Sequence, residues 1–149
     1  EYEREIRLEM KGFYVKGFID TSTAPLQIKK GTPEGYVKKI ADYKTGDVVK
    51  KRAEYEADSY TQVDIYSAAM RQQFGVLPES SKVYLIDRTG NAFKGEELKL
   101  GTKFITIDKP IDDDRADTVL KGVQEIAEEI SGYYKLFLKL NKIWVDYKT

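Results

Sequence analysis

Asp20, Asp42 and Lys44 have the side chains that metal-assisted hydrolysis requires. Asp20 closes an expected strand, while Asp42 and Lys44 stand two residues apart in another, so both point to one face of a sheet. If the two strands are neighbours, the two carboxylates can bind one metal ion, and the backbone carbonyl of Tyr43 can add a further oxygen ligand. The Lys44 ammonium could then orient water or stabilise negative charge on a phosphate. The triplet alone is weak evidence, because 34% of the residues are charged.

The composition narrows the chemistry further, since the chain has no cysteine and no histidine. It therefore has no disulfide, thiolate zinc site, iron–sulfur cluster or cysteine nucleophile, and no serine–histidine–aspartate triad or histidine base. Hydrolysis here would have to use carboxylates, lysine, tyrosine or a hard cation, and Mg²⁺ or Mn²⁺ is the natural choice for aspartate ligands. The formal charge is zero, which favours one local nucleic-acid patch over general coating of DNA.

Two further features follow the Asp-x-Lys strand. Gln62 and Tyr66 lie four residues apart on an expected helix and share a face, from which they could reach a nucleotide phosphate or base edge. Taken alone, the pair is better explained as a core tyrosine beside an incidental glutamine. A basic run in an expected loop could hold the phosphate backbone or be simply solvated; it consists of Lys50, Lys51 and Arg52. The surrounding Tyr43, Tyr55 and Tyr60 could stack on bases, but strand and core roles explain most tyrosines.

The elements that position these residues follow from periodicity and turn signals. Alternation predicts a β-hairpin, then three more strands; their ranges are Tyr2–Met10, Phe13–Asp20, Tyr36–Thr45, Lys82–Asp87 and Phe104–Ile107. Helical spacing predicts helices over Ser59–Phe74 and Arg115–Leu138. The second helix should bury one face, made of Val119, Leu120, Val123, Ile126, Ala127 and Ile130. Asp47–Ala57 is expected to be a loop, and Leu140–Thr149 a last strand or a disordered end.

These elements predict one α/β domain over residues 1–149, with a mixed central β-sheet flanked by helices. No run of about 18 apolar residues is present, and no secretory signal is visible, so a soluble, cytoplasmic protein without a membrane segment is expected. The tetrapeptide Asp42-Tyr43-Lys44-Thr45 recurs at 146–149. The second copy lacks the Gly46 and helix that follow the first, and we interpret it as coincidence.

Three motifs in order carry a resemblance: Gly17-Phe18-Ile19-Asp20, then Ile40 to Gly46, then Gln62-Val63-Asp64-Ile65-Tyr66. They resemble the RecB-like branch of the PD-(D/E)xK nuclease superfamily, whose pattern is Gly-x-x-Asp, a strand ending in Asp-x-Lys followed by Thr-Gly, and a helix with Gln-x-x-x-Tyr. The resemblance implies a restriction-endonuclease-like core. It also implies a Mg²⁺- or Mn²⁺-dependent deoxyribonuclease of the exonuclease type, acting in recombination, repair or phage replication.

The resemblance also implies roles for single residues. Asp20 and Asp42 would bind the metal, Lys44 would be the catalytic lysine, and Gln62 with Tyr66 would contact substrate or brace the site. Gly17 would allow a close approach of backbone near the site. DNA would be the substrate, and a helicase, a recombination protein or further copies of the chain would be candidate partners.

One departure from the family pattern concerns the N-terminal side. Many relatives carry a histidine or glutamate on a helix before the first strand, whereas this chain begins at a strand, so such a helix is expected to be missing. Glu5 and Glu9 could substitute for that residue or be solvated strand residues. Two alternatives to an enzyme stay open: a non-catalytic nucleic-acid or protein interaction module on the same fold, and a structural domain in which the motifs are accidental.

Overall fold

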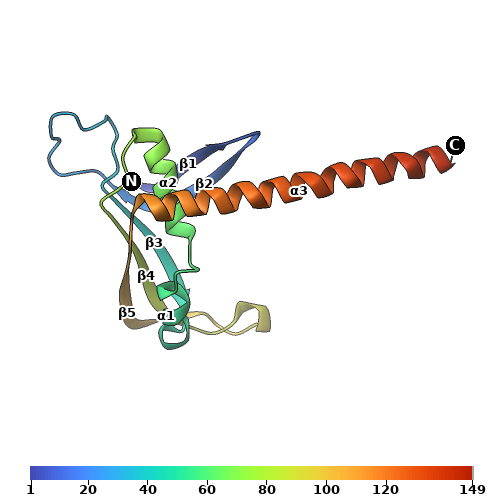
Figure 1. The fold of residues 1–149 in the computed structure, drawn as a ribbon. Coiled ribbons are helices and arrows are strands. Elements are labelled where there is room, and N and C mark those ends of the chain that lie inside the picture. Colours follow the sequence, from blue (N-terminus) through green and yellow to red (C-terminus); the bar gives the residue numbers. More distant parts are fainter. Residues whose placement is uncertain (149) are drawn as a thin grey trace.

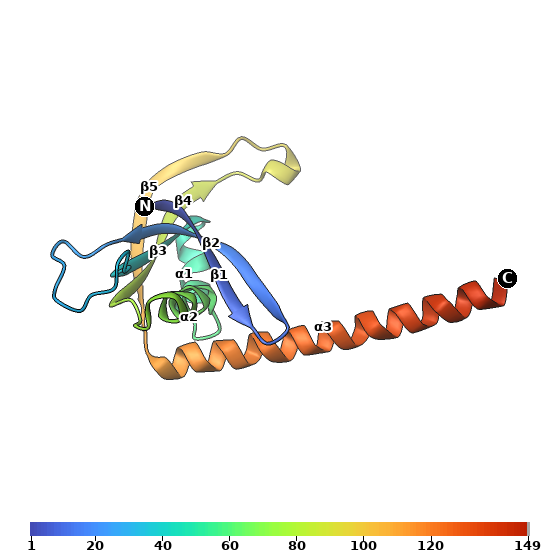
Figure 2. The same cartoon turned by 90° about the horizontal axis from the view of Figure 1, so that it is seen from above.

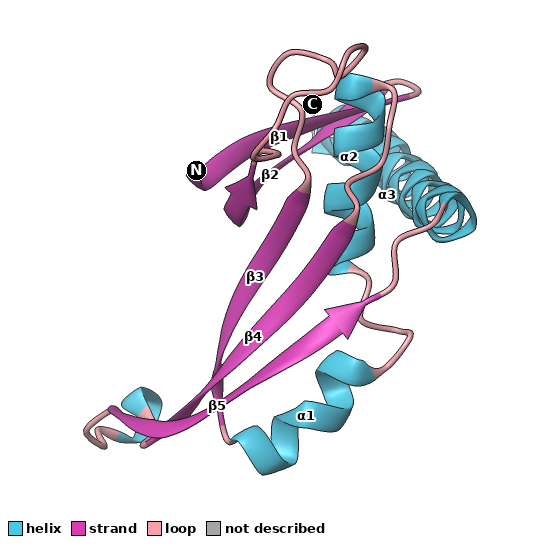
Figure 3. Cartoon of the chain, turned by 90° about the vertical axis from the view of Figure 1, so that its left-hand side faces the viewer, coloured by secondary structure: helices cyan, strands magenta, loops and turns pink. Residues whose placement is uncertain are grey.

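Five strands form one mixed sheet in the order β1-β2-β3-β4-β5, and helices cover one of its faces (Figures 1 and 3). The computed structural model describes residues 1–148; Thr149 lies outside the described residues. The elements are β1 (Tyr2–Met10), β2 (Phe13–Thr23), β3 (Lys39–Gly46), α1 (Val48–Glu56), α2 (Gln62–Phe74), β4 (Ser80–Thr89), the 3₁₀ turn η1 (Ala92–Lys94), β5 (Lys99–Lys109) and α3 (Asp113–Lys148). The predicted α/β class with a mixed sheet is confirmed.

The sheet has one parallel pair of strands, and this pair requires the connection that contains α1 and α2. β1 and β2 form the predicted antiparallel hairpin, while β2 pairs with β3 only over Thr21–Thr23. β3 and β4 are parallel along their shared length, from Lys39 opposite Ser80 to Gly46 opposite Asp87. A parallel pair needs a crossover connection, and α1 and α2 supply it. β5 returns antiparallel to β4 at the other edge.

Two apolar clusters lie between the sheet and its helices. The first cluster joins α2 to the sheet and consists of Ile6, Leu8, Ile19, Val37, Ile40, Tyr66, Ala69 and Met70. The second joins α1 to the sheet and consists of Val48, Tyr55, Val63, Val83, Leu85 and Ile107. The predicted stripe on α2 is thus confirmed, with Val63, Tyr66 and Met70 all buried. The opposite face of the sheet carries a stacked aromatic row in which Tyr43 and Phe104 are exposed and Tyr84, between them, is half-buried.

Residues 48–56 form the helix α1, so the predicted loop over Asp47–Ala57 is wrong. Asp47 caps the helix, and its carboxylate accepts hydrogen bonds from the backbone nitrogens of Val49 and Lys50, both at 3.0 Å. At the other end, the Lys109 ammonium donates to the backbone carbonyls of Tyr55 and Ala57, each at 2.9 Å. The helix is mostly polar and lacks a strong apolar stripe, so its stability comes from caps that periodicity does not reveal.

Several boundaries also differ from the predicted ones. β2 continues to Thr23, which places Asp20 inside the strand rather than at its end. β3 begins at Lys39 rather than Tyr36, and α2 begins at Gln62 rather than Ser59. Gly75 ends α2 as predicted, with a left-handed φ of 78°. β4 and β5 are longer than predicted because their antiparallel pairing continues past Asp87 and Phe104.

α3 is one continuous helix from Asp113 to Lys148, so the predicted end at Leu138 and the predicted strand or disorder beyond it are wrong for residues 140–148. The helix projects beyond the sheet, and its C-terminal end is far from the other elements (Figures 1 and 2). Its predicted buried face is only partly covered. Val119, Leu120, Val123 and Ala127 are half-buried, whereas Ile126 and Ile130 are 59% and 62% exposed.

Candidate active site

The Asp42 carboxylate is the centre of a polar cluster between β3 and α2, and it is 0% exposed. Its Oδ2 lies 2.9 Å from the Lys44 Nζ, which confirms that the two side chains share a face of the sheet. The same oxygen lies 2.6 Å from the Tyr60 hydroxyl, and Oδ1 accepts a hydrogen bond from the Gln62 amide at 3.3 Å. A buried carboxylate needs such partners, because an unpaired one would be very costly to fold.

Asp20 approaches the cluster from β2, which pairs with β3 and so meets the condition for a shared metal site. Its Oδ2 accepts a hydrogen bond from the Tyr43 backbone nitrogen at 2.7 Å. The β2–β3 ladder has its last pair at Thr21 and Ala41, so the Asp20 carboxylate replaces the next backbone acceptor. The N–H and C=O of one strand residue face the same neighbouring strand. The Tyr43 carbonyl therefore faces the same gap as the Asp20 carboxylate.

Gln62, at the first turn of α2, joins the two charged groups. Its Oε1 accepts a hydrogen bond from the Lys44 ammonium at 3.0 Å, while its Nε2 donates to Asp42 and to the Tyr66 hydroxyl. This arrangement fixes which end of the amide is oxygen, because the ammonium can only donate. Gln62 thus braces the Asp42–Lys44 pair, and Tyr66 supports Gln62 from one turn further along α2.

Tyr60 belongs to the same cluster, although the sequence suggested only that it could stack on bases. Its hydroxyl lies 2.6 Å from Asp42 Oδ2 and 2.9 Å from Gln62 Oε1. The hydroxyl has one proton, and the shorter, charge-assisted bond directs it to the carboxylate. The ring packs edge-on against Tyr55, with centroids 5.1 Å apart. A tyrosine just before a helix resembles any core tyrosine, so no sequence signal separates it from the other ten.

Burial and charge set the protonation of this cluster. Burial raises the pKa of Asp42, although hydrogen bonds from Tyr60 and Lys44 act in the opposite direction. Burial would lower the pKa of Lys44, but the hydrogen bond and negative charge of Asp42 outweigh it, and the net pKa is raised. Burial also raises the pKa of Tyr60, with Asp42 adding to the effect. Near neutral pH, Lys44 is therefore an ammonium and Tyr60 a neutral phenol.

The donor set suits a hard cation with few protein ligands. Two carboxylates and a backbone carbonyl face or border the β2–β3 gap, and all are oxygen donors, which Mg²⁺ and Mn²⁺ prefer. Among residues 1–148, no group of three or more histidine, cysteine, aspartate or glutamate side chains is placed to hold a metal. Mg²⁺ is commonly held by one or two carboxylates plus substrate phosphates and water, so a two-aspartate set is sufficient.

The remaining residues named from sequence lie elsewhere. The basic run is on α1, where Lys51 pairs with Glu54 at 2.8 Å and Arg52 with Glu56 at 2.6 Å. Gly17 lies beside the Ile6 side chain, and a β-carbon added to Gly17 would lie 3.6 Å from Ile6 Cγ1, which is an ordinary contact distance. The backbone at Gly17 is therefore not in an unusually close contact. The two glutamates considered as substitutes form exposed ion pairs on β1 and its hairpin, Glu5 with Lys16 and Glu9 with Arg7.

Comparisons of the chain with protein-family models, curated proteins and solved structures found no match. Any function assigned to this chain must therefore be inferred from the geometry of its site. In residues 1–148, no helix has both the length and the apolar character needed to cross a membrane.

Proposed function

We propose that this protein is a Mg²⁺- or Mn²⁺-dependent deoxyribonuclease with a restriction-endonuclease-like core, acting as an exonuclease. The observation that carries the proposal is the convergence of two strands. Asp20 from β2 and the Asp42–Lys44 pair from β3 meet where the β2–β3 ladder ends. Three polar groups of α2 and the loop before it support that pair. The resemblance to the RecB-like nucleases supports the proposal, because the assembly contains the aspartate of Gly-x-x-Asp, the Asp-x-Lys pair and the Gln-x-x-x-Tyr pair in that order.

Each side chain has a definite task in the proposed reaction. Asp20, Asp42 and the Tyr43 carbonyl would hold the cation, which when bound would activate water and polarise a phosphoryl oxygen. The Lys44 ammonium would offset negative charge on the phosphate, because its raised pKa keeps it protonated. Gln62 would keep the ammonium in position. Lys50, Lys51 and Arg52 would contact the DNA backbone from α1. Lys51 and Arg52 would exchange their intrahelical partners Glu54 and Glu56 for phosphates.

The test is cleavage of end-labelled linear double-stranded DNA with Mg²⁺, with Mn²⁺ and with EDTA. We expect cleavage with either metal and none with EDTA. Asp42→Asn should abolish it, and Lys44→Met should slow it by about 10²–10³-fold. The recurring Asp-Tyr-Lys at 146–148 supplies a matched control, because Asp146 lies on the far part of α3, and Asp146→Asn should cleave like the wild type. A folded protein that cuts no DNA with either metal would exclude the proposal.

One observation favours the non-catalytic module as the second candidate. Asp42 is already satisfied by Lys44, Tyr60 and Gln62 without any cation. If the cluster is purely structural, DNA binding should survive EDTA, weaken with salt and occur without cleavage. A Mn²⁺ titration by calorimetry separates the two candidates, because only the nuclease should show binding that Asp20→Asn removes.

A further inference from the structure

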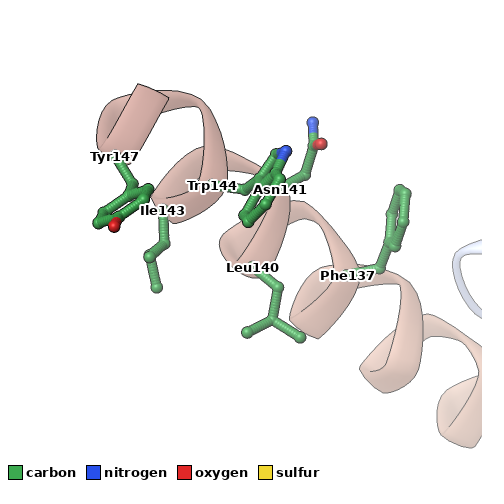
Figure 4. A pocket seen from close by; sticks show the side chains of 6 residues that line it. All are labelled: Phe137, Leu140, Asn141, Ile143, Trp144 and Tyr147. Carbon is green, nitrogen blue, oxygen red and sulfur yellow. The ribbon is translucent and has the colours of Figure 1, made fainter. Parts of the chain in front are cut away.

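The distal half of α3 is an apolar surface that no other element among residues 1–148 covers. Every residue from Glu128 to Lys148 is exposed, and the helix there extends past the sheet (Figures 1 and 2). Large side chains line this half, among them Phe137, Leu140, Ile143, Trp144 and Tyr147 (Figure 4). Phe137 and Trp144 are 61% and 57% exposed. A contiguous aromatic surface of this kind marks an interaction site in a soluble protein.

The spacing of the apolar residues specifies what kind of element covers them. From Ala116 to Tyr147, apolar residues alternate at intervals of three and four without a break. The first half of this seam begins at Ala116, which the folded domain already buries, and continues with Val119, Val123, Ile126 and Ile130. The second half contains Tyr133, Phe137, Leu140, Trp144 and Tyr147. A 3–4 repeat over four heptads is typical of a coiled coil. The position on the opposite side of the helix is charged in each heptad, at Lys121, Glu128, Lys135 and Lys142. This pattern of one apolar seam and one charged side is that of a helix which pairs with another helix.

The charges along α3 favour a second copy of the same helix running the opposite way. Residues 113–130 contain six acidic and two basic side chains, whereas residues 131–148 contain four lysines and one aspartate. A parallel pair would place acidic beside acidic and basic beside basic. An antiparallel pair places each acidic half beside a basic half, which is the arrangement that charge complementarity selects.

The sizes of the seam residues point to the same arrangement. With the two-fold axis between Ser131 and Gly132, Ile130 faces Tyr133 of the second copy, and Ile126 faces its Phe137. Val123 then faces Leu140 of the second copy, and Val119 faces its Trp144. Each pair sets a smaller residue of one half against a larger residue of the other, as close packing requires. A parallel pair would instead set Trp144 against Trp144 and Val119 against Val119, which crowds one layer and leaves a void in the other.

The proximal half of α3 offers an open groove for that distal half. A groove of about 560 Å³ runs between α2 and α3, and its apolar lining includes Ile65, Val119, Val123 and Ile126. Asp58 and Asp114 lie at its edge, where lysines of an incoming helix would be attracted. α3 itself is anchored there by Arg71, which contacts Asp113 at 2.7 Å and Asp117 at 2.6 Å. The groove is therefore formed before any partner arrives.

We propose that this protein forms a two-fold symmetric dimer in which two α3 helices pair antiparallel, the distal aromatic half of each lying along the proximal half of the other. Four aromatic side chains from each copy, in the seam at positions 133, 137, 144 and 147, together bury on the order of 1,000 Å². That is the size a specific interface requires. The two folded domains lie at opposite ends of the helix pair, so each site at Asp42 stays separate.

Light scattering after size exclusion tests the stoichiometry. The full chain at micromolar concentration should have the mass of a dimer. Phe137→Glu with Trp144→Glu should give a monomer that still unfolds cooperatively in urea, since both positions lie outside the folded domain. Lys142→Glu, on the opposite side of the helix, should remain a dimer. A monomeric wild type, or a dimer that survives the double substitution, would overturn the proposal.

Disulfide cross-linking tests the relative orientation of the two helices, and no native cysteine competes with the introduced ones. A mixture of Val123→Cys and Leu140→Cys proteins should form a disulfide between the two variants on oxidation. Leu140→Cys alone should not cross-link, because its own counterpart lies far away in an antiparallel pair. Efficient cross-linking of Leu140→Cys alone would show a parallel pair and overturn the proposed orientation. Sedimentation of a monomeric wild type with phosphatidylserine vesicles would overturn the proposal in favour of a lipid surface.

Discussion

The Asp20 carboxylate accepts a hydrogen bond from the backbone nitrogen of Tyr43 at the point where β2 and β3 separate. Asp20 thereby closes the end of a ladder and places its charge beside the Asp42–Lys44 pair, where it contributes to the electrostatics of both groups. Backbone pairing of β2 and β3 stops here because the Asp20 carboxylate takes the place of a backbone acceptor. Asp20 therefore both marks the gap between the strands and supplies a carboxylate that could bind a cation in it.

Replacing Asp20 by asparagine should separate these two tasks. The amide oxygen of Asn can still accept from Tyr43, so the free energy of unfolding in EDTA should stay close to that of the wild type. Asp20→Ala leaves the Tyr43 N–H without its acceptor, and we expect a loss of about 1–3 kcal/mol. Both substitutions should abolish Mn²⁺ binding in calorimetry and DNA cleavage. Equal stability of the two variants, or Mn²⁺ binding by either, would contradict this account of Asp20.

Lys44 should act through its charge. Lys44→Met should lower kcat by about 10²–10³-fold, the usual cost of removing one group that stabilises transition-state charge, with a much smaller change in KM. Because the net pKa of Lys44 is raised above its ordinary 10.5, the wild type should not lose rate through this group between about pH 8 and about pH 10. A rate profile in which Lys44→Arg keeps the alkaline plateau but has a lower rate would support the role. A fall in wild-type rate over this range that is absent from Lys44→Arg would show that the pKa of Lys44 is not raised, and equal rates of Lys44→Met and the wild type would refute the role of its charge.

Asp42 should make the metal-free protein less stable as its carboxyl ionises. Burial raises the pKa of Asp42 above its ordinary 3.8, so the folded state disfavours the ionised form relative to the unfolded state. The wild type should therefore be most stable, relative to Asp42→Asn, below pH 3.8. That advantage should decrease as the pH rises through the raised pKa and then stay constant. Urea unfolding of both proteins in EDTA across this range measures the difference. A difference that grows with pH would show that Lys44 and Tyr60 outweigh burial.

Local spacing was enough to predict much of the site. The two-residue period of a strand places Asp42 and Lys44 on one face, and the four-residue spacing of a helix places Gln62 beside Tyr66. Whether Asp20 and Asp42 lie on neighbouring strands was a condition that the sequence left open, and the strand order of the structure meets it. The restriction-endonuclease-like core and the nuclease activity stay predictions.

Other features depend on tertiary contacts that no local pattern encodes. Tyr60 joins the site only because the segment before α2 passes over Asp42. α1 was missed because its ends are fixed by Asp47 and by the distant Lys109. The predicted buried face of α3 is only partly buried, because Ile126 and Ile130 lie where the helix runs past the sheet and are exposed. Periodicity identifies the apolar face of a helix without showing what covers it.

The attachment of α3 to the domain should depend far more on the ion pair of Arg115 with Asp64 than on the ion pair of Arg115 with Asp58. Arg115 contacts the buried Asp64 through two nitrogens, at 3.1 and 3.2 Å, and the exposed Asp58 at 3.4 Å. Arg115→Met strands a buried carboxylate, and we expect a loss of about 3–5 kcal/mol. Asp58→Asn removes an exposed partner of the same arginine and should cost about 0–1 kcal/mol.

A double substitution distinguishes loss of the pair from loss of the arginine. Arg115→Met with Asp64→Leu removes the stranded charge and fills the site with apolar atoms, so it should recover most of the stability that Arg115→Met loses. Urea unfolding followed by circular dichroism measures all four proteins on one scale. If the double variant is as unstable as Arg115→Met, the arginine stabilises α3 through packing of its own side chain. The buried charge of Asp64 would then have no part in holding the helix to α2.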